Sequence, residues 1–270
     1  MKVVLFCGGF GMRLREYSET VPKPLVPIGT RPILWHLMRY YAHYGYKDFV
    51  LCLGYQASAI KQFFLRYEEA LSNDFILNGA GGSVELLSRD VHDWRITFVD
   101  TGLHANIGSR LYAVREHLAC EEVFLANYAD GLSDLPLDTY VPSALAQNVT
   151  ATFVSIPPPH LFNVIETDEN NNVRSIEYMN RSDLRMNGGF FVFRRDLFDY
   201  MRPGEELVEQ PFQRLIQAKQ LQAYPYEGFW ASMDTFKDRQ RLDDLYARGE
   251  APWAVWEKGV LEKGVLEKNG

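Results

Sequence analysis

The sequence predicts an α/β protein built on a Rossmann-like, doubly wound and mostly parallel sheet. Short apolar runs rich in β-branched residues alternate with helix-like segments through the first half of the chain, as βα units do. The first run ends abruptly in three glycines within four positions, which is typical of a buried strand entering a nucleotide-binding turn. After about residue 150 the runs shorten and polar turns separate them. We therefore expect a mixed sheet that carries a small β-rich extension.

Individual elements follow from apolar spacing. The predicted helices are 32–44, 57–71, 107–118, 210–219 and 234–247. The predicted strands are 2–7, 48–53, 95–100, 122–127, 150–156, 163–167, 173–178 and 188–193. Residues 78–93 contain Gly79-Ala80-Gly81-Gly82 and are expected to form a loop or excursion.

Composition and charge exclude several classes of protein. The formal net charge of −7 argues against a general nucleic-acid binder, because binding to a phosphate backbone needs a basic surface. The three cysteines are far apart, and Cys7 and Cys52 lie in apolar runs, so we expect buried free thiols rather than disulfides or a metal site. No signal peptide precedes the first strand and no apolar run reaches membrane-spanning length. The expected protein is soluble and cytoplasmic.

The opening loop has the properties of an anion site. Its glycines, Gly8, Gly9 and Gly11, let backbone N–H groups approach an anion without obstruction by a Cβ. Arg13 and Lys23 bring positive charge to the same region. The loop matches neither the P-loop nor the dinucleotide fingerprint. A nucleotide triphosphate site is the working hypothesis, and a tight βα turn with a surface arginine explains the loop equally well when it is taken alone.

Three charged residues could complete such a site. Lys23 lies between two prolines, whose fixed φ angles give it a stiff backbone, although a solvated loop lysine is the alternative. Asp130 follows the strand 122–127, where a carboxylate could hold Mg²⁺, although Asp-Gly is also a common turn. Asp234 directly precedes a helical stretch, and an N-cap is its alternative role.

Other polar positions are less specific. Arg110, near the start of the helix 107–118, could clamp phosphate oxygens or lie on a solvated face. Asn187-Gly188-Gly189 at a strand entrance suits recognition of a sugar hydroxyl, and a plain β-turn explains it as well. His36 and His43 are expected to be structural. No signature of a covalent nucleophile is found.

Taken in order, these segments resemble the sugar-1-phosphate nucleotidylyltransferases, and the resemblance extends from about Met1 to Trp256. It rests on residues 8–14, 22–24, 32–36, 54–55, 99–102, 187–192, 228–235 and 251–257. It implies a GT-A-like nucleotidyltransferase fold and favours the cytidylyl branch of the family. The implied reaction is attack of a sugar 1-phosphate on the α-phosphorus of CTP, giving a CDP-sugar and pyrophosphate without a covalent intermediate.

The resemblance also implies roles on the nucleotide side. Gly8, Gly9 and Gly11 would line the nucleotide, and Arg13 would contact the β- and γ-phosphates. Lys23 would neutralise charge at the α-phosphate, and Arg110 matches an arginine that contacts phosphate or nucleotide.

Metal and acceptor roles follow in the same way. Asp130 and Asp234 match paired aspartates that hold Mg²⁺, so Arg13, Lys23 and Asp130 are the implied catalytic residues. Asn187, Gly188, Tyr178, Met179 and Arg181 are the candidate acceptor-binding residues. CTP and a phosphorylated, sugar-like acceptor are the implied partners, with no nucleic acid and no membrane, and relatives suggest a homo-oligomer.

The chain departs from the family mainly on the acceptor side. Tyr178-Met179-Asn180 stands where the family has Glu-Lys-Pro, and loss of one charge-assisted contact to a phosphate costs about 1.5–3 kcal/mol. Arg181 or Arg185 could supply the missing charge. Smaller departures are Met12, Ala129 and Asn163, where the family usually has Thr, Gly and Gly.

Several hypotheses therefore stay open. The first is a cytidylyltransferase that uses glucose 1-phosphate or a variant phosphorylated acceptor. The alternatives are a catalytically weakened protein that binds or senses a nucleotide sugar, a nucleotidyltransferase that uses another NTP, and, less favoured, a glycosyltransferase of related topology.

We expect one domain over residues 1–256. Its nucleotide-binding part would span about 1–149 and its acceptor-binding part about 150–256. Residues 257–270 contain Gly-Val-Leu-Glu-Lys twice, a repeat too short to bury a core, so we expect a disordered or added tail.

Overall fold

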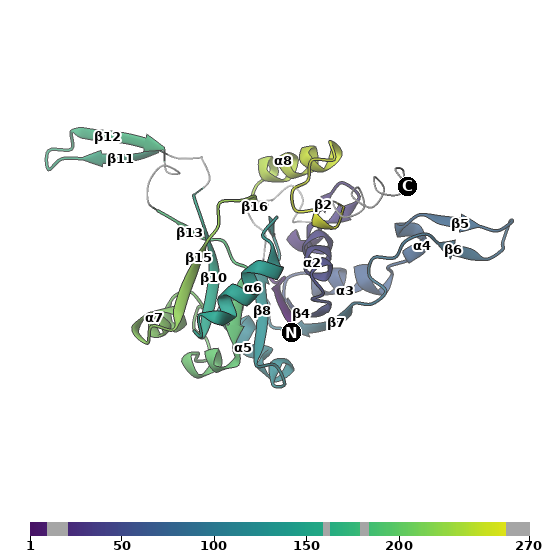
Figure 1. Cartoon of the computed structure of the whole chain (residues 1–270), viewed down its shortest axis with the longest axis horizontal. Helices are drawn as coiled ribbons and strands as arrows, with labels where there is room; N and C mark the ends of the chain where they lie inside the picture. The colour runs from purple at the N-terminus through teal and green to yellow at the C-terminus, as the bar shows by residue number, and fades with distance from the viewer. Residues whose placement is uncertain (10–20, 159–162, 179–183, 258–270) are drawn as a thin grey trace, which may run out of the picture.

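The computed structural model describes residues 1–9, 21–158, 163–178 and 184–257. Its core is a mixed sheet of eight strands, shown in Figure 1. In spatial order these are β13 (Met186–Asn187), β10 (Ala151–Ile156), β14 (Phe191–Arg194), β8 (Val123–Tyr128), β1 (Val3–Phe6), β4 (Asp48–Leu53) and β7 (Arg95–Asp100), with β15 (Leu221–Pro225) paired to β10. The predicted mixed α/β class is confirmed.

The central strand β1 shows why the sheet is covered on both faces. It pairs in parallel with β4 on one side and with β8 on the other. Val3 and Leu5 belong to the core that includes α2 (Ile33–His43), α6 (Leu137–Ala146) and α8 (Phe236–Ala247). Val4 and Phe6 belong to a second core, with α5 (Ile107–Ala113) and α7 (Gln210–Gln217). Such two-sided burial requires the continuous apolar run seen in the sequence.

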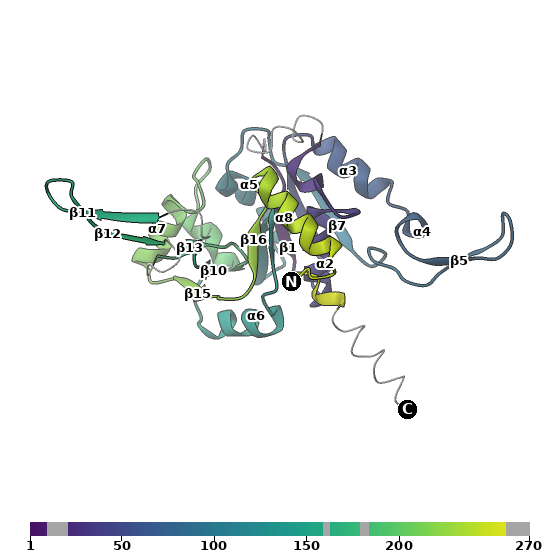
Figure 2. The ribbon, with the colours of Figure 1, turned by 90° about the horizontal axis from the view of Figure 1, so that it is seen from above.

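The second half of the chain supplies the antiparallel part. β14 pairs antiparallel with both β8 and β10, and β15 runs parallel to β10. The hairpin of β11 (Asn163–Thr167) and β12 (Val173–Tyr178) pairs with neither of them and projects far from the body, as Figures 1 and 2 show. This is the β-rich extension expected after residue 150.

Some element predictions were wrong in detail. The helix expected over 57–71 breaks into α3 (Ala57–Leu65) and α4 (Glu69–Ser72). The excursion expected over 78–93 contains one strand of a ribbon, β5 (Phe75–Leu77) paired with β6 (Val84–Leu86). The strand expected over 188–193 begins only at Phe191, because Gly189 and Phe190 take positive φ angles of 75° and 50°. Extended strands do not adopt such angles.

Several elements were not predicted. They include α6, β15 and a short antiparallel pair, β9 (Gly131–Ser133) with β16 (Trp230–Ser232). Each strand of the pair has only three residues, too few for alternation of apolar side chains to reveal it. This small sheet matters because it lies beside the candidate site.

The cysteine prediction is confirmed. Cys7 and Cys52 are buried free thiols, whereas Cys120 is exposed. Burial raises the pKa of the Cys52 thiol to about 12, which makes it unreactive at neutral pH.

Among the described residues, no helix combines the length and the apolar character needed to cross a membrane. The disordered or added tail was predicted over residues 257–270. Glu257 is described and donates its N–H to the carbonyl of Ala254 at 3.0 Å, so the tail begins at least one residue later than predicted. Residues 258–270 lie outside the described part of the chain.

His36 is the structural histidine of this fold. Its side chain is fully buried in α2. Nε2 lies 3.0 Å from the carbonyl oxygen of Ile28, and Nδ1 accepts a hydrogen bond of 3.3 Å from Trp253 Nε1. This arrangement requires the neutral imidazole with its proton on Nε2. Burial lowers the pKa of His36 to about 4.

The protein is expected to lose stability on mild acidification through His36. The pKa of His36 is about 6.5 in the unfolded state and lower in the folded state. The contribution of the neutral His36 to the free energy of unfolding is therefore fully present above pH 6.5 and is lost as the pH falls toward 4. The loss from this group should be about 3 kcal/mol at pH 4. Urea unfolding at pH 7 and pH 4.5, compared with a His36→Gln variant, measures it. A variant with the same pH dependence as the wild type would contradict the assignment.

Candidate active site

The opening loop leaves the sheet between two neighbouring strand ends. β1 and β8 are in register, with Phe6 opposite Tyr128, so Gly8 and Asp130 follow at the same edge of the sheet. Cys7 continues the ladder by donating its N–H to the carbonyl of Cys52 at 3.0 Å. Gly8 and Gly9 then end the strand, and Gly9 is exposed. Gly11 and Arg13, the other predicted residues of this loop, lie outside the described residues.

Arg110 lies against the loop from the protein side. Its side chain is 1% exposed, and Nη1 donates to the carbonyl oxygens of Leu53 and Gly102 and to Thr101 Oγ1, at 2.8–3.0 Å. Arg110 thus joins the carboxyl ends of β4 and β7 below Gly8. In this arrangement Nη1 of Arg110 faces protein oxygens, and its contact with the nucleotide stays a prediction. We interpret Arg110 as a positioning residue.

Glycine at position 8 is required by this contact. A Cβ on Gly8 would lie 2.2 Å from Arg110 Nη1, whereas a Cβ on Gly9 would have no heavy atom within 4 Å. Gly8→Ala is therefore expected to lower the free energy of unfolding by about 1–3 kcal/mol and to raise KM for the nucleotide. Gly9→Ala is the matched control and should keep wild-type stability. Urea unfolding of both variants measures the difference, and equal stabilities would refute the contact.

The small sheet of β9 and β16 brings the two predicted aspartates together. Ser232 pairs with Gly131, and Met233 donates its N–H to the carbonyl of Asp130 at 2.9 Å. Asp130 directly precedes β9 and Asp234 follows β16 by two residues, so their side chains start close together at one end of this pair. The alternative of Asp234 as an N-cap is wrong. Thr235 caps α8, in a capping box with Asp238.

Lys23 lies between these two carboxylates. It opens the short 3-10 helix η2 (Lys23–Leu25), in which Pro24 is buried. Its Nζ donates to Asp130 Oδ2 at 2.5 Å and to Asp234 Oδ1 at 2.9 Å, and its side chain is 16% exposed. Burial alone would lower the pKa of Lys23, but the two carboxylates outweigh burial and raise it. The ammonium is therefore fully charged at neutral pH.

The two aspartates fit a hard divalent cation. Both offer carboxylate oxygens, and the Lys23 ammonium already marks a point where positive charge is stabilised between them. Within the described ranges, no cluster of three or more His, Cys, Asp or Glu side chains suits a metal. Mg²⁺ is usually bound by one or two carboxylates, and water and substrate phosphate take its remaining coordination positions, whereas Ca²⁺ takes more oxygen ligands. Two carboxylates therefore suit Mg²⁺ better than Ca²⁺.

The predicted acceptor residues Asn187 and Gly188 face the same edge from the other half of the sheet. Asn187 Oδ1 accepts the N–H of Gly189 at 2.9 Å. Gly188 accepts a hydrogen bond of 2.8 Å from Trp230 Nε1 through its carbonyl. A Cβ on Gly188 would lie 3.2–3.3 Å from Ile156 and Val154 of β10 and from Trp230 of β16. The turn at Gly188 therefore packs tightly against both strands.

Asn127 is a positioning residue that sequence reasoning missed. It is 1% exposed at the end of β8, and its Oδ1 accepts the N–H groups of Tyr128 and Phe190 at 2.9 and 3.0 Å. These bonds hold the left-handed backbone of Gly189 and Phe190. The available signal was a lone amide in an otherwise apolar strand, since a buried amide must find partners.

The remaining acceptor candidates are only partly placed. Tyr178 ends β12 at the base of the projecting hairpin, opposite Asn163. Met179 and Arg181 lie outside the described residues. Arg185 is described, and its guanidinium donates to Ser155 Oγ at 3.1 Å and to Glu227 Oε1 at 2.6 Å. Its partner Glu227 is 70% exposed, and the suggestion that Arg185 supplies charge to the acceptor stays a prediction.

Comparison with known proteins agrees with this geometry. The nucleotidyl transferase family model matches residues 2–238. The chain is 38% identical over 259 residues to glucose-1-phosphate cytidylyltransferase of Salmonella typhi, covering 95% of this chain and 100% of that protein. It is 25% identical to mannose-1-phosphate guanyltransferase of Schizosaccharomyces pombe, covering 88% of this chain and 62% of that protein.

A solved structure has a similar fold. Apo UDP-glucose pyrophosphorylase superimposes with a TM-score of 0.67 at 13% identity, over 92% of this chain and 99% of that chain. The family match, the extent of the relatives' identity and the arrangement of Lys23, Asp130 and Asp234 lead to one conclusion. The chain belongs to the sugar-1-phosphate nucleotidylyltransferase family and is a nucleotidyltransferase enzyme.

Proposed function

We propose that this enzyme transfers a cytidylyl group from CTP to glucose 1-phosphate, giving CDP-glucose and pyrophosphate. The observation that carries the proposal is the Lys23 ammonium held between Asp130 and Asp234, next to the Gly8–Gly9 turn. This site combines backbone donors, one fixed cation and two carboxylates at the carboxyl edge of a parallel sheet, which suits a nucleoside triphosphate. The 38% identity to a glucose-1-phosphate cytidylyltransferase supports the choice of base and sugar.

The proposed chemistry is a single in-line displacement. An oxygen of the sugar phosphate forms a bond to the α-phosphorus of CTP, and the bond from that phosphorus to the bridging oxygen breaks, so pyrophosphate leaves with the electron pair. Lys23 would stabilise the charge that develops on the α-phosphoryl oxygens, and the N–H groups of Gly8 and Gly9 would orient the nucleotide. Arg110 would keep that turn in place.

Asp130 and Asp234 would hold Mg²⁺. When bound, the ion neutralises phosphate charge and aligns the triphosphate. The carboxylates of this chain contribute the binding charge, and Ser232 fixes the orientation of Asp234 by donating to Oδ2 at 3.0 Å.

Other parts of the proposal concern the whole protein. We propose one domain over residues 1–256, with the nucleotide site built mainly from residues 1–149 and the acceptor site from 150–256. Asn187, Gly188, Tyr178, Met179 and Arg181 are proposed to contact the acceptor. The buried reduced thiols of Cys7 and Cys52 suit a cytoplasmic location. We also propose a homo-oligomer.

A pyrophosphate-release assay tests the proposed reaction. CTP, UTP, GTP, ATP and dTTP are each offered with glucose 1-phosphate, mannose 1-phosphate and galactose 1-phosphate, in the presence of Mg²⁺. The expected result is the highest kcat/KM with CTP and glucose 1-phosphate, and a CDP-glucose product identified by mass spectrometry. Preference for another nucleotide would overturn the base, and preference for another sugar would overturn the acceptor.

A further inference from the structure

The short strand β16 carries contacts to both halves of the candidate active site. Trp230 and Ser232 lie on the same face of it, because side chains alternate along a strand. Trp230 Nε1 donates to the carbonyl of Gly188 at 2.8 Å, on the acceptor side. Ser232 Oγ donates to Asp234 Oδ2 at 3.0 Å, on the metal side. The position of β16 therefore sets the spacing between the two sides.

Strand pairing alone holds β16 only weakly. Among the described strands its partner is β9, and the two form a separate sheet with three residues in each strand. A two-stranded ribbon is at best marginally stable alone in water. At the carboxyl end of β16, the N–H of Met233 is bound to the Asp130 carbonyl. The amino end, where Phe229 leads into Trp230, needs an anchor of its own.

Asp134 is that anchor. It directly follows β9 and is half-buried. Its Oδ1 accepts the N–H of Phe229 at 2.8 Å, and its own N–H donates to the Phe229 carbonyl at 3.3 Å. Ser133 Oγ in β9 donates to the same carbonyl at 2.7 Å. Both polar groups of the Phe229 backbone are therefore bound, and β16 begins at the next residue.

Tyr226 brings the preceding turn to the same carboxylate. Its hydroxyl donates to Asp134 Oδ1 at 2.5 Å. Burial, and after it the hydrogen bond to this carboxylate, raise the pKa of Tyr226 above its ordinary value, so the hydroxyl keeps its proton and stays a donor at neutral pH. Hydrogen bonds to a carboxylate are about twice as strong as those between neutral groups. One oxygen of Asp134 thus fixes both ends of the turn 226–229.

The turn is built around this contact and also reaches the acceptor side. A Cβ on Gly228 would lie 2.2 Å from the Tyr226 hydroxyl oxygen and 2.9 Å from Asp134 Oδ1, so a side chain here would push the hydroxyl away from the carboxylate. Arg185, directly before β13, donates to the Tyr226 carbonyl at 3.1 Å and to Glu227 Oε1 at 2.6 Å. The turn therefore links β9 to the residues that precede the Asn187–Gly188 turn.

We propose that Asp134 is a positioning residue of the active site. By binding Tyr226 and Phe229 it fixes the start of β16. Through β16 it sets the spacing between Asp234 and the turn at Gly188, and the inference rests on the roles proposed for those two residues. Loss of a group that orients a metal ligand typically costs about 10–100-fold in metal affinity or activity. An effect near the lower end is expected here, because Asp134 acts through the backbone.

Tyr226→Phe tests the contact without changing a charge. It should raise the KM for glucose 1-phosphate and the Mg²⁺ concentration for half-maximal rate by about threefold each. Asp134→Ala also frees Phe229 and should raise both by about tenfold. Asp134→Asn keeps an oxygen acceptor and should recover most of this loss. The KM for CTP at saturating Mg²⁺ should not change, since the Gly8–Gly9 turn follows β1 and not β16.

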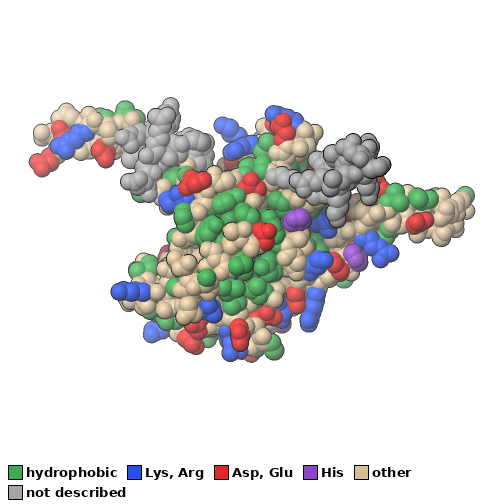
Figure 3. All heavy atoms as spheres, viewed as in Figure 1, with side chains coloured by type: hydrophobic (Ala, Val, Ile, Leu, Met, Phe, Trp, Pro, Cys, Tyr) green, Lys and Arg blue, Asp and Glu red, His purple; other side chains and the backbone are tan. Residues whose placement is uncertain are grey.

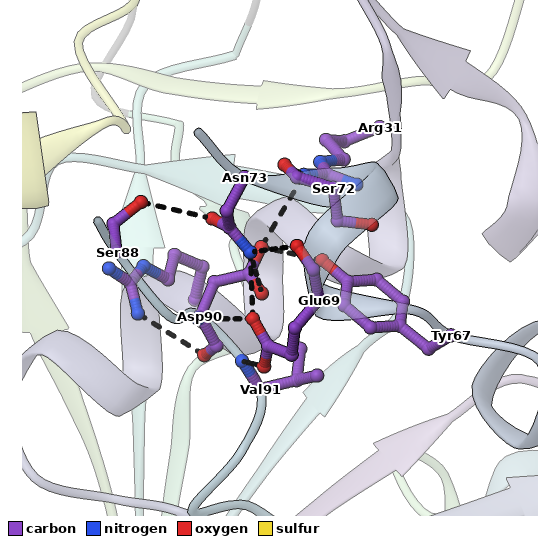
Figure 4. A network of polar contacts seen from close by, with 9 residues as sticks. Arg31, Tyr67, Glu69, Ser72, Asn73, Ser88, Asp90 and Val91 are labelled. Carbon is purple, nitrogen blue, oxygen red and sulfur yellow. Dashed lines mark hydrogen bonds and ion pairs between the residues drawn. The ribbon is translucent and has the colours of Figure 1, made fainter. Parts of the chain in front are cut away.

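Tyr67→Phe is the matched control. The Tyr67 hydroxyl also donates to a carboxylate at 2.5 Å, that of Asp90, which is 4% exposed. Figure 4 shows both side chains in a polar network with Glu69 and Asn73. Figures 1 and 2 show this region, at the base of the β5–β6 ribbon, well apart from β16, and the ribbon stands clear of the body in Figure 3. Tyr67→Phe should lose at least as much stability as Tyr226→Phe and keep all three kinetic constants.

Two measurements without turnover make the test independent of the proposed reaction. Paramagnetic resonance with Mn²⁺ measures the metal affinity of the enzyme alone, and hydrogen–deuterium exchange measures opening of the peptide 226–235. Tyr226→Phe and Asp134→Ala should weaken Mn²⁺ binding and speed exchange in this peptide. Gly228→Ala displaces the hydroxyl without altering either partner and should behave like Tyr226→Phe. Tyr67→Phe should change neither quantity.

Two results would overturn the role of Asp134. One is a Tyr226→Phe variant with wild-type Mn²⁺ affinity and wild-type exchange over residues 226–235. The other is a KM for CTP that rises as much as the KM for glucose 1-phosphate, which would indicate a general loss of structure. A wild type that releases no pyrophosphate from CTP and glucose 1-phosphate would instead overturn the proposed reaction, and the Mn²⁺ and exchange data would still decide the role of Asp134.

Discussion

The Lys23→Met variant is expected to bind Mg²⁺ at least about tenfold more tightly than the wild type in the absence of nucleotide, while its kcat/KM falls by roughly 10²–10³. The ammonium of Lys23 is shared by Asp130 and Asp234, so it competes with a divalent cation for the same oxygens. Removing it leaves two carboxylates without their neutralising charge. The same change removes the cation that would stabilise the transferred phosphoryl group.

Metal affinity and turnover are measured separately. Calorimetry with Mg²⁺, or paramagnetic resonance with Mn²⁺ in its place, reports binding to the enzyme alone, and pyrophosphate release reports turnover. Lys47→Met is the matched control, since Lys47 forms an exposed ion pair with Asp93 at 2.5 Å and should change neither quantity. A Lys23→Met variant with weaker metal binding than the wild type would show that lysine and cation do not compete.

Asp130→Asn and Asp234→Asn are expected to reduce kcat by about 10²–10³, and each should require a higher Mg²⁺ concentration for half-maximal rate. The carboxamide keeps the shape of the side chain but loses the charge that holds both Lys23 and a cation. Asp130 lies in the turn between β8 and β9, which the Met233 N–H fixes through the backbone carbonyl of Asp130, so replacing its side chain should leave the fold intact.

Stability and metal dependence distinguish this role from a structural one. Asp93→Asn removes a carboxylate from an exposed ion pair and serves as the control of equal charge change. All three variants should unfold within about 1 kcal/mol of the wild type. If excess Mg²⁺ left the rate deficit of the site variants unchanged and their half-saturating Mg²⁺ concentration matched that of the wild type, the two aspartates would not be metal ligands.

The sequence was sufficient to predict the nucleotide half of the candidate site as a set of residue types. Taken singly, Lys23, Asp130 and Asp234 each had a plain alternative role, and the family resemblance grouped them. The structure brings both carboxylates within hydrogen-bonding distance of Lys23. Their mutual placement was not predictable, because it depends on the three-residue pair of β9 and β16. Such short strands carry no periodicity.

Arg110 illustrates a different limit. A helical arginine near a phosphate site has the same local sequence whether it points outward to a ligand or inward to carbonyl groups. The choice depends on Gly8 and Gly54, whose missing side chains leave space for the guanidinium. Sequence patterns describe the elements that carry such residues, but the direction of a long side chain is decided by packing between distant strands.

For the fold, buried parallel strands were predicted well and surface segments poorly. β4 has the expected bounds, because a continuous apolar run of this length suits a buried strand. β7 also has the expected bounds, although it lies at the edge of the sheet and none of its residues is buried. The segment 78–93 was expected to be a loop or excursion. Its apolar residues are exposed rather than packed in the core. Apolar spacing predicts strands and helices that bury one face within the same chain, so it does not predict the strands of this segment.

The late position of β16 in the chain has a consequence for protein synthesis. Lys23 is separated from Asp130 by 107 residues and from Asp234 by 211. During translation the amino-terminal strands can assemble first, yet β9 stays without its partner until residues 230–232 have left the ribosome. A truncated product that ends before β16 thus holds the glycine turn and one carboxylate only. The contacts of Lys23 with both carboxylates can therefore form only after Asp234 has been synthesised.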